Sequence, residues 1–299
     1  MVLSPSRAGS PLWILDPVRV EQWKNKAVLI TGASRGIGKE LARQLADGGA
    51  RIGLVGLEPD LLAELAAQLG EGHCWVHADV TDHEGMAAAT AKVVAEFGGL
   101  DVVVANAGVV PFGTTRQITP EAFTRTIDVN LNGVFHTVRC AIPHLIERRG
   151  YILVVSSSAS LIPVVGMSAY CAAKSGAEAL ANVLRMELAH LGVRVGSAHT
   201  GFVDTDMTRQ MNTVMPSLHR ARTRLPWPLG GTVSAQSCAR ALVRGIERRA
   251  RRIFVPRPIW LLHLGRVLAA SELVQTIGAR FLSRLVPATE SEVRAATEH

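Results

Sequence analysis

The sequence contains few cysteines and few aromatic residues. Its four cysteines lie far apart, with no CxxC pair and no clustered histidines: Cys74, Cys140, Cys171 and Cys238. This spacing argues against a disulfide framework and against a zinc site, so we expect no metal and a reducing, cytoplasmic environment. Aromatic residues make up only 5% of a chain that is 48% hydrophobic, which indicates an aliphatic core with helices packed closely on a buried sheet.

Long apolar runs are also missing. Residues 1–23 contain prolines and charges without an apolar stretch of signal-peptide length, so we expect an N-terminal arm and no secretion signal. The longest apolar run near the other end, 259–270, is interrupted by His263 and Arg266 and is too short to cross a bilayer. The sequence therefore predicts no transmembrane helix.

Positive charge is concentrated toward the C-terminus. The formal net charge is +7, but residues 240–284 alone carry ten arginines against Glu247 and Glu272, a local charge of +8. The rest of the chain is about neutral, so we expect no nucleic-acid partner. Apolar residues such as Trp260 and Phe281 interleave with the arginines. This mixture favours either contact with an anionic membrane surface or a solvated helix face beside a subunit interface.

Residues 24–256 alternate short β-branched runs with longer helical stretches. Seven runs predict strands, near 27–32, 50–55, 74–80, 100–108, 151–158, 193–199 and 251–256. Long helical stretches cover about 119–147 and 168–190. This alternation indicates one α/β domain with a Rossmann-type, doubly wound, seven-stranded parallel sheet flanked by helices.

Two segments lie outside that alternation. Residues 207–231 have no clean period and follow the sixth strand, so we interpret them as a substrate lid. Residues 257–299 form a basic and apolar C-terminal extension that we expect to be helical. Four of its apolar residues fall on one helical face: Val274, Ile277, Phe281 and Leu285.

A glycine turn opens directly into a helix after the first strand, in the run TGASRGIG. Gly32 permits a tight turn, Gly36 lets the backbone approach a pyrophosphate, and Gly38 allows close contact between helix and strand. The position of this turn predicts a dinucleotide site at the N-terminus of the first helix.

This run resembles the fingerprint of the short-chain dehydrogenase/reductase family, in its single-domain branch, over roughly residues 24–256. Further landmarks match in order, namely His77 to Val80, Asn106 to Gly108, Asn130, and Tyr170 to Lys174. The resemblance implies that Asp79 and Val80 flank the adenine and that Asn106 stabilises the sheet beside the cofactor. It implies these cofactor-binding residues: Thr31, Gly32, Ser34, Arg35, Gly36, Ile37, Gly38, Asp79, Val80, Asn106, Ala107, Gly108, Tyr170, Lys174, Gly201, Val203 and Thr205.

Tyr170 and Lys174 are the expected acid–base pair. They lie four residues apart on one helix, so both side chains project from the same face, and a nearby ammonium favours the phenolate. In the family the catalytic serine stands thirteen residues before the tyrosine, which selects Ser157 and leaves Ser156 and Ser158 structural. By resemblance Asn130 holds a water that passes protons toward Lys174.

The choice of nicotinamide depends on the end of the second strand. NAD enzymes need a carboxylate there for the ribose hydroxyl, and NADP enzymes need a cation for the 2′-phosphate. Here Gly56 and Leu57 stand at those places, and Arg35 in the glycine turn is the remaining cation. We therefore favour NADP(H) over NAD(H), although Glu58 would repel the phosphate.

Together these residues predict an NADP(H)-dependent oxidoreductase that interconverts an alcohol and a carbonyl on a lipophilic substrate. An NAD(H)-dependent dehydrogenase, a non-catalytic cofactor-binding protein at a membrane surface, and an epimerase or dehydratase are the alternatives. The sequence departs from the family at Thr200, where a proline is usual before Gly201. The resemblance therefore does not determine the backbone conformation at this place. The family commonly forms homodimers or homotetramers, and we expect an oligomer.

Overall fold

The seven predicted strands form one parallel sheet. The computed structural model describes residues 23–269 and 271–297, so the N-terminal arm lies almost wholly outside the described residues. The sheet order is β3-β2-β1-β4-β5-β6-β9. The strands are β1 Ala27–Thr31, β2 Arg51–Gly56, β3 Cys74–His77, β4 Val102–Ala105, β5 Tyr151–Val155, β6 Arg194–Thr200 and β9 Arg252–Val255. The chain winds outward from β1 to β3 and then returns to β4, which confirms the doubly wound fold.

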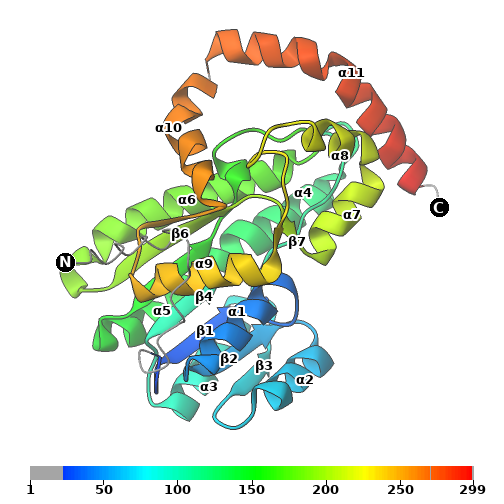
Figure 1. Ribbon diagram of the computed structural model, residues 1–299. Helices are drawn as coiled ribbons and strands as arrows, with labels where there is room; N and C mark the ends of the chain where they lie inside the picture. Colours follow the sequence, from blue (N-terminus) through cyan, green and yellow to red (C-terminus); the bar gives the residue numbers. More distant parts are fainter. Residues whose placement is uncertain (1–22, 270, 298–299) are drawn as a thin grey trace, which may run out of the picture.

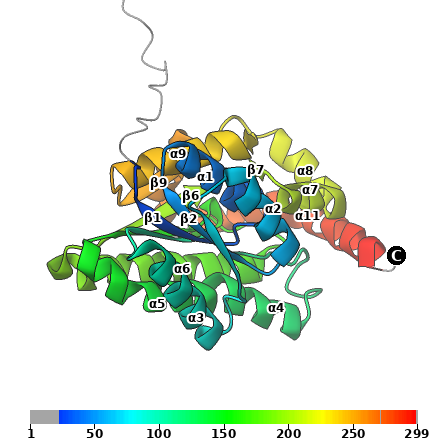
Figure 2. The same cartoon turned by 90° about the horizontal axis from the view of Figure 1, so that it is seen from below.

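Helices cover both faces of the sheet (Figure 2). One face packs against α1 Gly36–Asp47, α2 Pro59–Leu69 and α9 Ala235–Glu247. The other packs against α3 His83–Phe97, α5 Gly133–Arg148 and α6 Ser168–Glu187. The strands β1, β4 and β5 are buried along their whole length, as expected for a parallel sheet with two covered faces.

The predicted helix over 119–147 is interrupted. It consists of α4 Pro120–Ile127, a π-helical segment η2 Asp128–Asn132, and α5. A π-helical turn inserts an extra residue into the helix, and such turns occur frequently at functional sites. Asn130 lies within η2 and is fully buried. The predicted helix over 168–190 ends at Glu187 and is followed by a short 3-10 turn, η4 Ala189–Leu191.

The segment interpreted as a lid contains two short helices that the sequence pattern did not reveal, α7 Asp206–Val214 and α8 Pro216–Thr223. Two short strands, β7 Val203–Asp204 and β8 Val233–Ser234, pair with each other on either side of this segment. The two ends of the segment therefore lie side by side, joined by the β7-β8 pair.

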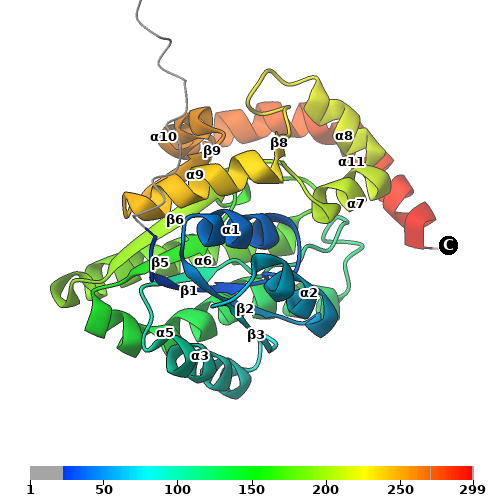
Figure 3. The same ribbon diagram turned by 60° about the horizontal axis from the view of Figure 1, so that its bottom comes forward.

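The C-terminal extension is helical, as expected. It runs through a 3-10 turn η5 Arg257–Ile259, then α10 Trp260–Ala269 and α11 Glu272–Thr297. Figure 1 shows α10 and α11, in orange to red, curving over the part of the molecule that holds α7 and α8. Figure 3 shows α8 and α11 side by side, and they are in contact. No described helix is long and apolar enough to cross a membrane.

The apolar face expected on α11 is only partly buried. Leu285 packs against a methionine-rich cluster that includes Met211 and Met215, whereas the Ile277 side chain is 60% exposed. The side chains of Val274 and Phe281 lie outside the described ones.

Candidate active site

The glycine turn is tied to the end of β4. The Nδ2 atom of Asn106 donates to the carbonyl oxygens of Thr31 and Gly32 at 3.0 and 3.1 Å, and the Asn106 backbone N–H donates to Thr31 Oγ1 at 3.1 Å. Gly32 has a φ of +63°, and a Cβ there would lie 2.8 Å from the Cα of Ala107. The turn therefore requires glycine at this position both for its conformation and for its close approach to the next strand.

The start of α1 leaves its backbone N–H groups available to a ligand. Arg35 is the N-cap residue, and its side chain makes no capping hydrogen bond. Unpaired N–H groups and the helix dipole together favour an anion at this place. The residues present thus fit a pyrophosphate.

A cavity of about 320 Å³ extends from this turn across the carboxyl ends of the strands. Thirteen predicted site residues line it: Gly32, Ser34, Arg35, Gly36, Ile37, Asp79, Val80, Asn106, Ala107, Gly108, Tyr170, Lys174 and Thr205. It runs from the glycine turn to Tyr170 and Lys174, at the carboxyl ends of the strands where a dinucleotide binds in this type of fold. We call it the dinucleotide cavity.

Thr31, Gly38 and Asn130 do not line the dinucleotide cavity. Thr31 is buried and supports the turn through its hydroxyl, and a Cβ at Gly38 would collide with the Gly32 carbonyl oxygen. Asn130 donates from Nδ2 to the Val109 and Thr126 carbonyl oxygens at 2.8 and 2.9 Å, and its Oδ1 has no partner among the described residues. These three residues therefore support the wall of the dinucleotide cavity without lining it.

Glu58 lines the dinucleotide cavity at the end near the glycine turn, beside Ser34 and Arg35. Its carboxylate accepts a hydrogen bond from Ser34 Oγ at 2.7 Å and lies 3.6 Å from Arg35 Nε. The three residues come from the glycine turn and from the end of β2, which the fold brings together. Arg35, the cation that favours NADP(H), and Glu58, the carboxylate that opposes it, therefore form an ion pair.

A smaller pocket of about 90 Å³ adjoins the dinucleotide cavity, and Tyr170, Thr200 and Thr205 line both. We call it the reaction pocket. Ser157, Gly201 and Val203 also line it, together with the apolar residues Met167, Met211 and Phe202. Ser157 and Tyr170 thus face one small, largely apolar space.

Burial shifts the pKa values of both titrating groups. It lowers the pKa of Lys174, which is 3% exposed, to about 8. It raises the pKa of Tyr170 to about 12, although a hydrogen bond with Ser157 opposes this rise. The expected lowering of the Tyr170 pKa by the Lys174 ammonium is therefore not found: loss of water around the phenol is the largest effect, and only the Ser157 hydrogen bond opposes it.

The Lys174 ammonium lies behind the phenol ring. Its Nζ atom is 5.6 Å from the centre of the Tyr170 ring and donates to the Val155 carbonyl oxygen at 2.8 Å. Ser156 Oγ donates to the Lys174 carbonyl oxygen at 3.2 Å, so β5 and the start of α6 hold each other in register. The two side chains of the pair occupy one face of α6, as the four-residue spacing predicts.

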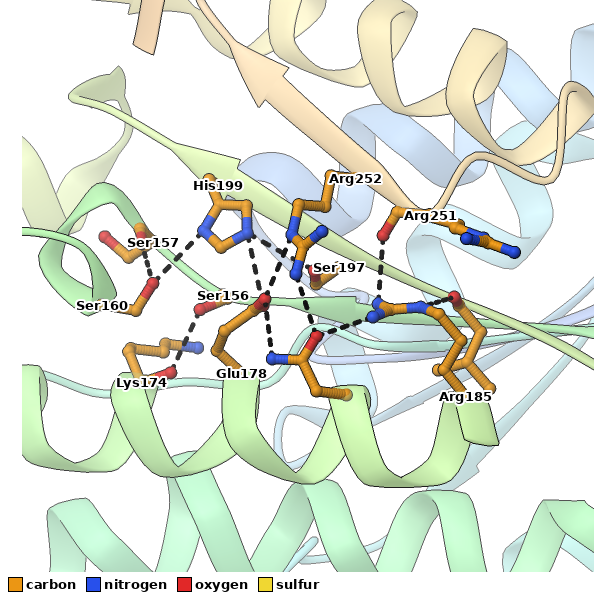
Figure 4. Close-up of polar contacts among 12 residues, drawn as sticks. Ser156, Ser157, Ser160, Lys174, Glu178, Arg185, Ser197, His199, Arg251 and Arg252 are labelled. Carbon is orange, nitrogen blue, oxygen red and sulfur yellow. Dashed lines mark hydrogen bonds and ion pairs between the residues drawn. The ribbon is translucent and has the colours of Figure 1, made fainter. Parts of the chain in front are cut away.

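A buried polar network lies beside the Ser157 turn, drawn in Figure 4. His199 is fully buried on β6, with Nε2 3.3 Å from Glu178 Oε2 and Nδ1 3.2 Å from Ser160 Oγ. Ser160 Oγ donates to the Ser157 carbonyl oxygen at 2.6 Å. Because that bond uses the only Ser160 proton, Nδ1 must donate to Ser160, and both ring nitrogens then face acceptors.

His199, Glu178 and Ser160 were not among the site residues predicted from the sequence. Glu178 follows Lys174 by four residues and also lies 3.5 Å from Arg252 Nε. Burial favours the protonated acid, but contacts with His199 and Ser197 and the charge of Arg252 lower the pKa of Glu178 to about 2. The network connects α6, β6 and β9 to the backbone of Ser157.

The backbone at Thr200 stays within the sheet. Thr200 pairs with Val255 of β9, and the Gly201 backbone N–H donates to the Val255 carbonyl oxygen at 2.7 Å. Ser157 Oγ donates to the Thr200 carbonyl oxygen at 3.4 Å. Thr200, at the place of the usual proline, is thus the last residue of β6, and Gly201 lines the reaction pocket.

Comparison with known proteins adds three kinds of similarity. The model of the short chain dehydrogenase family matches residues 26–215. (-)-trans-Carveol dehydrogenase of Rhodococcus erythropolis is 37% identical over 209 residues, which cover 64% of this chain and 75% of that protein. Trans-4-hydroxycyclohexanecarboxylate dehydrogenase of Sinomonas cyclohexanicum is 36% identical over 192 residues, 61% of this chain and 74% of that protein.

Solved structures agree with the fold. A short-chain type dehydrogenase/reductase from Mycobacterium marinum superposes with a TM-score of 0.70 at 26% identity, covering 78% of this chain and 94% of that one. A 3-ketoacyl-(acyl-carrier-protein) reductase from Brucella melitensis, complexed with NADH, gives the same score and identity over 78% and 97%.

Proposed function

The chain belongs to the short-chain dehydrogenase family, and from this premise we propose that it is an NADP(H)-dependent oxidoreductase that interconverts an alcohol and a carbonyl on a lipophilic substrate. The observation that carries the proposal is the shared wall of the two spaces: Tyr170 borders both the dinucleotide cavity and the reaction pocket. The nicotinamide dinucleotide, when bound, supplies or accepts the hydride.

The protein groups handle the proton. Tyr170 donates the phenolic proton to the substrate oxygen during reduction and takes it back during oxidation. A pKa of about 12 keeps this proton on the phenol until a substrate oxygen needs it. Ser157 donates a hydrogen bond to the same oxygen, and the Lys174 ammonium stabilises the phenolate as it forms. Asn130 Oδ1, which has no partner in the described part of the chain, is the acceptor that would hold a water on the proton path.

The preference for NADP(H) rests on Arg35. Its side chain is 59% exposed beside the adenosine part of the dinucleotide cavity, where a 2′-phosphate would lie. The paired Glu58 supports the alternative, NAD(H), because a carboxylate accepts the ribose hydroxyl and repels phosphate. The phosphate would have to draw Arg35 away from Glu58.

A lipophilic substrate is supported by the lining of the reaction pocket, where Met167, Met207, Met211 and Phe202 gather around the catalytic candidates. The named relatives oxidise alicyclic alcohols, carveol and hydroxycyclohexanecarboxylate. We also propose that residues 207–231 form a lid over the substrate and that residues 24–256 form the catalytic domain.

The proposal is tested by titrating the full chain with NADPH and NADH while following fluorescence, then by assaying a panel of alicyclic and aliphatic ketones. We expect saturable binding of a dinucleotide and ketone-dependent loss of the reduced nicotinamide absorbance. Absence of binding to both dinucleotides would exclude the oxidoreductase and favour an unrelated use of the fold.

A further inference from the structure

A second apolar cavity adjoins the reaction pocket. It has a volume of about 230 Å³, and it shares Ser158, Val164, Gly201 and Phe202 with that pocket. Four separate parts of the chain enclose it: the turn after β5, the residues that follow β6, helix α8 with the residues after it, and the C-terminal extension. The extension contributes Ile259, Leu262, Leu282 and Leu285. A ligand that reaches the reaction pocket can thus continue into this space.

One cation interrupts the apolar lining. Arg222 of α8 lines the cavity, although the whole residue is only 5% exposed. Its Nη1 atom donates to Thr232 Oγ1 at 3.1 Å, and its Nη2 atom lies 3.2 Å from His219 Nδ1. The guanidinium carbon lies 4.1 Å from the centre of the Phe202 ring, which lines both spaces.

Arg222 has no carboxylate partner among the described residues, and its Nε atom is buried without a hydrogen-bond acceptor. Burial lowers the pKa of this guanidinium, which shows that the charge is removed from water. A buried charge without a counter-ion is costly, and stacking on one aromatic ring offsets only part of that cost. The neighbouring Arg220, by contrast, lies 3.4 Å from Glu292. The cavity therefore presents an uncompensated positive charge at an apolar wall.

We propose that this cavity is a subsite for a substrate with an apolar body and a carboxylate, in which Arg222 pairs with the carboxylate. The hydrocarbon body contacts the apolar lining supplied by α8 and by the C-terminal extension. The alcohol or carbonyl carbon lies beside Ser157 and Tyr170. The inference rests on the proposed function and narrows its substrate to hydroxy acids and oxo acids of a lipophilic kind.

Ligand binding tests the subsite without requiring turnover. Sodium decanoate and methyl decanoate are titrated against the full-length protein and against Arg222→Met, with Arg224→Met as the matched control on the exposed side of the same segment. We expect Arg222→Met to weaken decanoate by at least about tenfold, the loss of a charge-assisted pair, and to leave the ester within about twofold. Arg224→Met should change neither ligand.

Equal decanoate affinity in the wild-type protein and Arg222→Met would overturn the pairing. So would an equal loss of acid and ester, since the charge would then have no selective effect. A second variant, Ala221→Phe, fills the cavity from α8 without altering charge. Ala221→Phe should weaken the binding of both ligands. Unchanged binding in this variant would show that the ligands bind outside the cavity. This test remains available if Arg222→Met does not fold.

Turnover separates this inference from the proposed function. Methyl-ketone acids and their methyl esters are compared as substrates for wild type and Arg222→Met. Reduction of the esters with no advantage for the acids would overturn the subsite and leave the oxidoreductase intact. Selective, Arg222-dependent binding of decanoate without reduction of any ketone would support the subsite and contradict the proposed function.

Discussion

Burial acts on Lys174 and Tyr170 in opposite chemical senses. It lowers the pKa of the lysine to about 8 and raises that of the tyrosine to about 12. Near neutral pH both groups consequently carry their protons. This state is ready to reduce a carbonyl, because the phenol can donate and the ammonium can stabilise the resulting phenolate.

The lysine pKa leads to a prediction for the pH profile of reduction. As pH rises through about 8, Lys174 loses its proton and the phenolate loses its stabilising charge. We expect kcat/KM for ketone reduction to fall above that pH in the wild-type protein. Lys174→Arg, which keeps its charge, should remove the break while lowering the overall rate. A profile that is flat through pH 8 in the wild type would contradict the assignment.

Glu178 leads to a prediction for stability. Its pKa of about 2 lies below the usual glutamate value of 4.5, so its ionised form stabilises the fold fully above about pH 4.5. That contribution, on the order of 3 kcal/mol, is lost as pH falls from there toward 2. Thermal melts between pH 7 and pH 3 should show a steeper decline for wild type than for Glu178→Gln.

Glu187→Gln, on the exposed side of the same helix, is the control for that experiment and should decline like wild type. If Glu178→Gln and wild type decline in parallel, the contacts with His199 and Arg252 do not stabilise the carboxylate. We also expect a lower kcat in the variant, because the network reaches the Ser157 backbone through His199 and Ser160.

Arg35 and Glu58 decide the dinucleotide preference together. Arg35→Ala should weaken NADPH by about tenfold or more, through loss of a charge-assisted bond, and leave NADH within about threefold. Glu58→Gln should strengthen NADPH, because the arginine is released and a repulsive charge removed. Equal effects on both dinucleotides would mean that neither side chain contacts the 2′-phosphate.

Sequence order locates the residues that belong to motifs, but it does not show their partners. Tyr170, Lys174 and Ser157 were expected from the motif spacing. In the structure Tyr170 lines the reaction pocket with Ser157 and the dinucleotide cavity with Lys174. The contact of Arg35 with Glu58 and the network around His199 were not expected. Each joins residues from different elements, and only the folded sheet brings them within bonding distance.

The strands were predicted most completely at the level of elements. Buried parallel strands are continuous β-branched runs, and all seven predicted strands were found in one parallel sheet. The π-helical turn at Asp128–Asn132 and the helices of the segment 207–231 were not predicted. The turn and these helices are short. Their apolar residues do not repeat with one regular helical period, because they pack against distant parts of the chain.

Helix α11 is held on the core by two glutamates. Glu290 Oε1 accepts from Thr114 Oγ1 at 2.7 Å, and the Glu292 carboxylate accepts from the backbone N–H and the hydroxyl of Ser217 at the start of α8. Glu292→Gln should weaken this attachment and increase hydrogen exchange in both α8 and the end of α11. Glu272→Gln, exposed at the other end of α11, should not. Unchanged exchange in Glu292→Gln would show that apolar packing alone holds the helix.

The C-terminal extension carries exposed apolar side chains on the surface of the molecule. Leu261, Leu264 and Ile277 are each more than half exposed, beside the arginines that give this region its positive charge. This surface fits both expectations for the extension, a subunit interface or an anionic membrane surface. We expect an oligomer, with these side chains at the interface.

Leu264→Asp tests that expectation, because Leu264 does not line the second apolar cavity. The variant should lower the mass measured by light scattering and leave dinucleotide binding unchanged. Vesicles containing anionic lipid distinguish the membrane alternative, in which the wild type binds, added salt weakens binding, and the variant fails to bind. A monomeric wild type that binds no vesicles would exclude both roles.

The most direct test of the account is a comparison of wild type with Tyr170→Phe. Dissociation constants for the preferred dinucleotide and the rate of hydride transfer to a reactive ketone are measured on the same preparations. The substitution removes the titrating hydroxyl and keeps the ring that borders both the dinucleotide cavity and the reaction pocket. If Tyr170 is the acid and base, we expect a dissociation constant within about twofold of wild type and loss of hydride transfer by about a hundredfold or more. Transfer within a few-fold of wild type would contradict the assignment of Tyr170 as the acid and base.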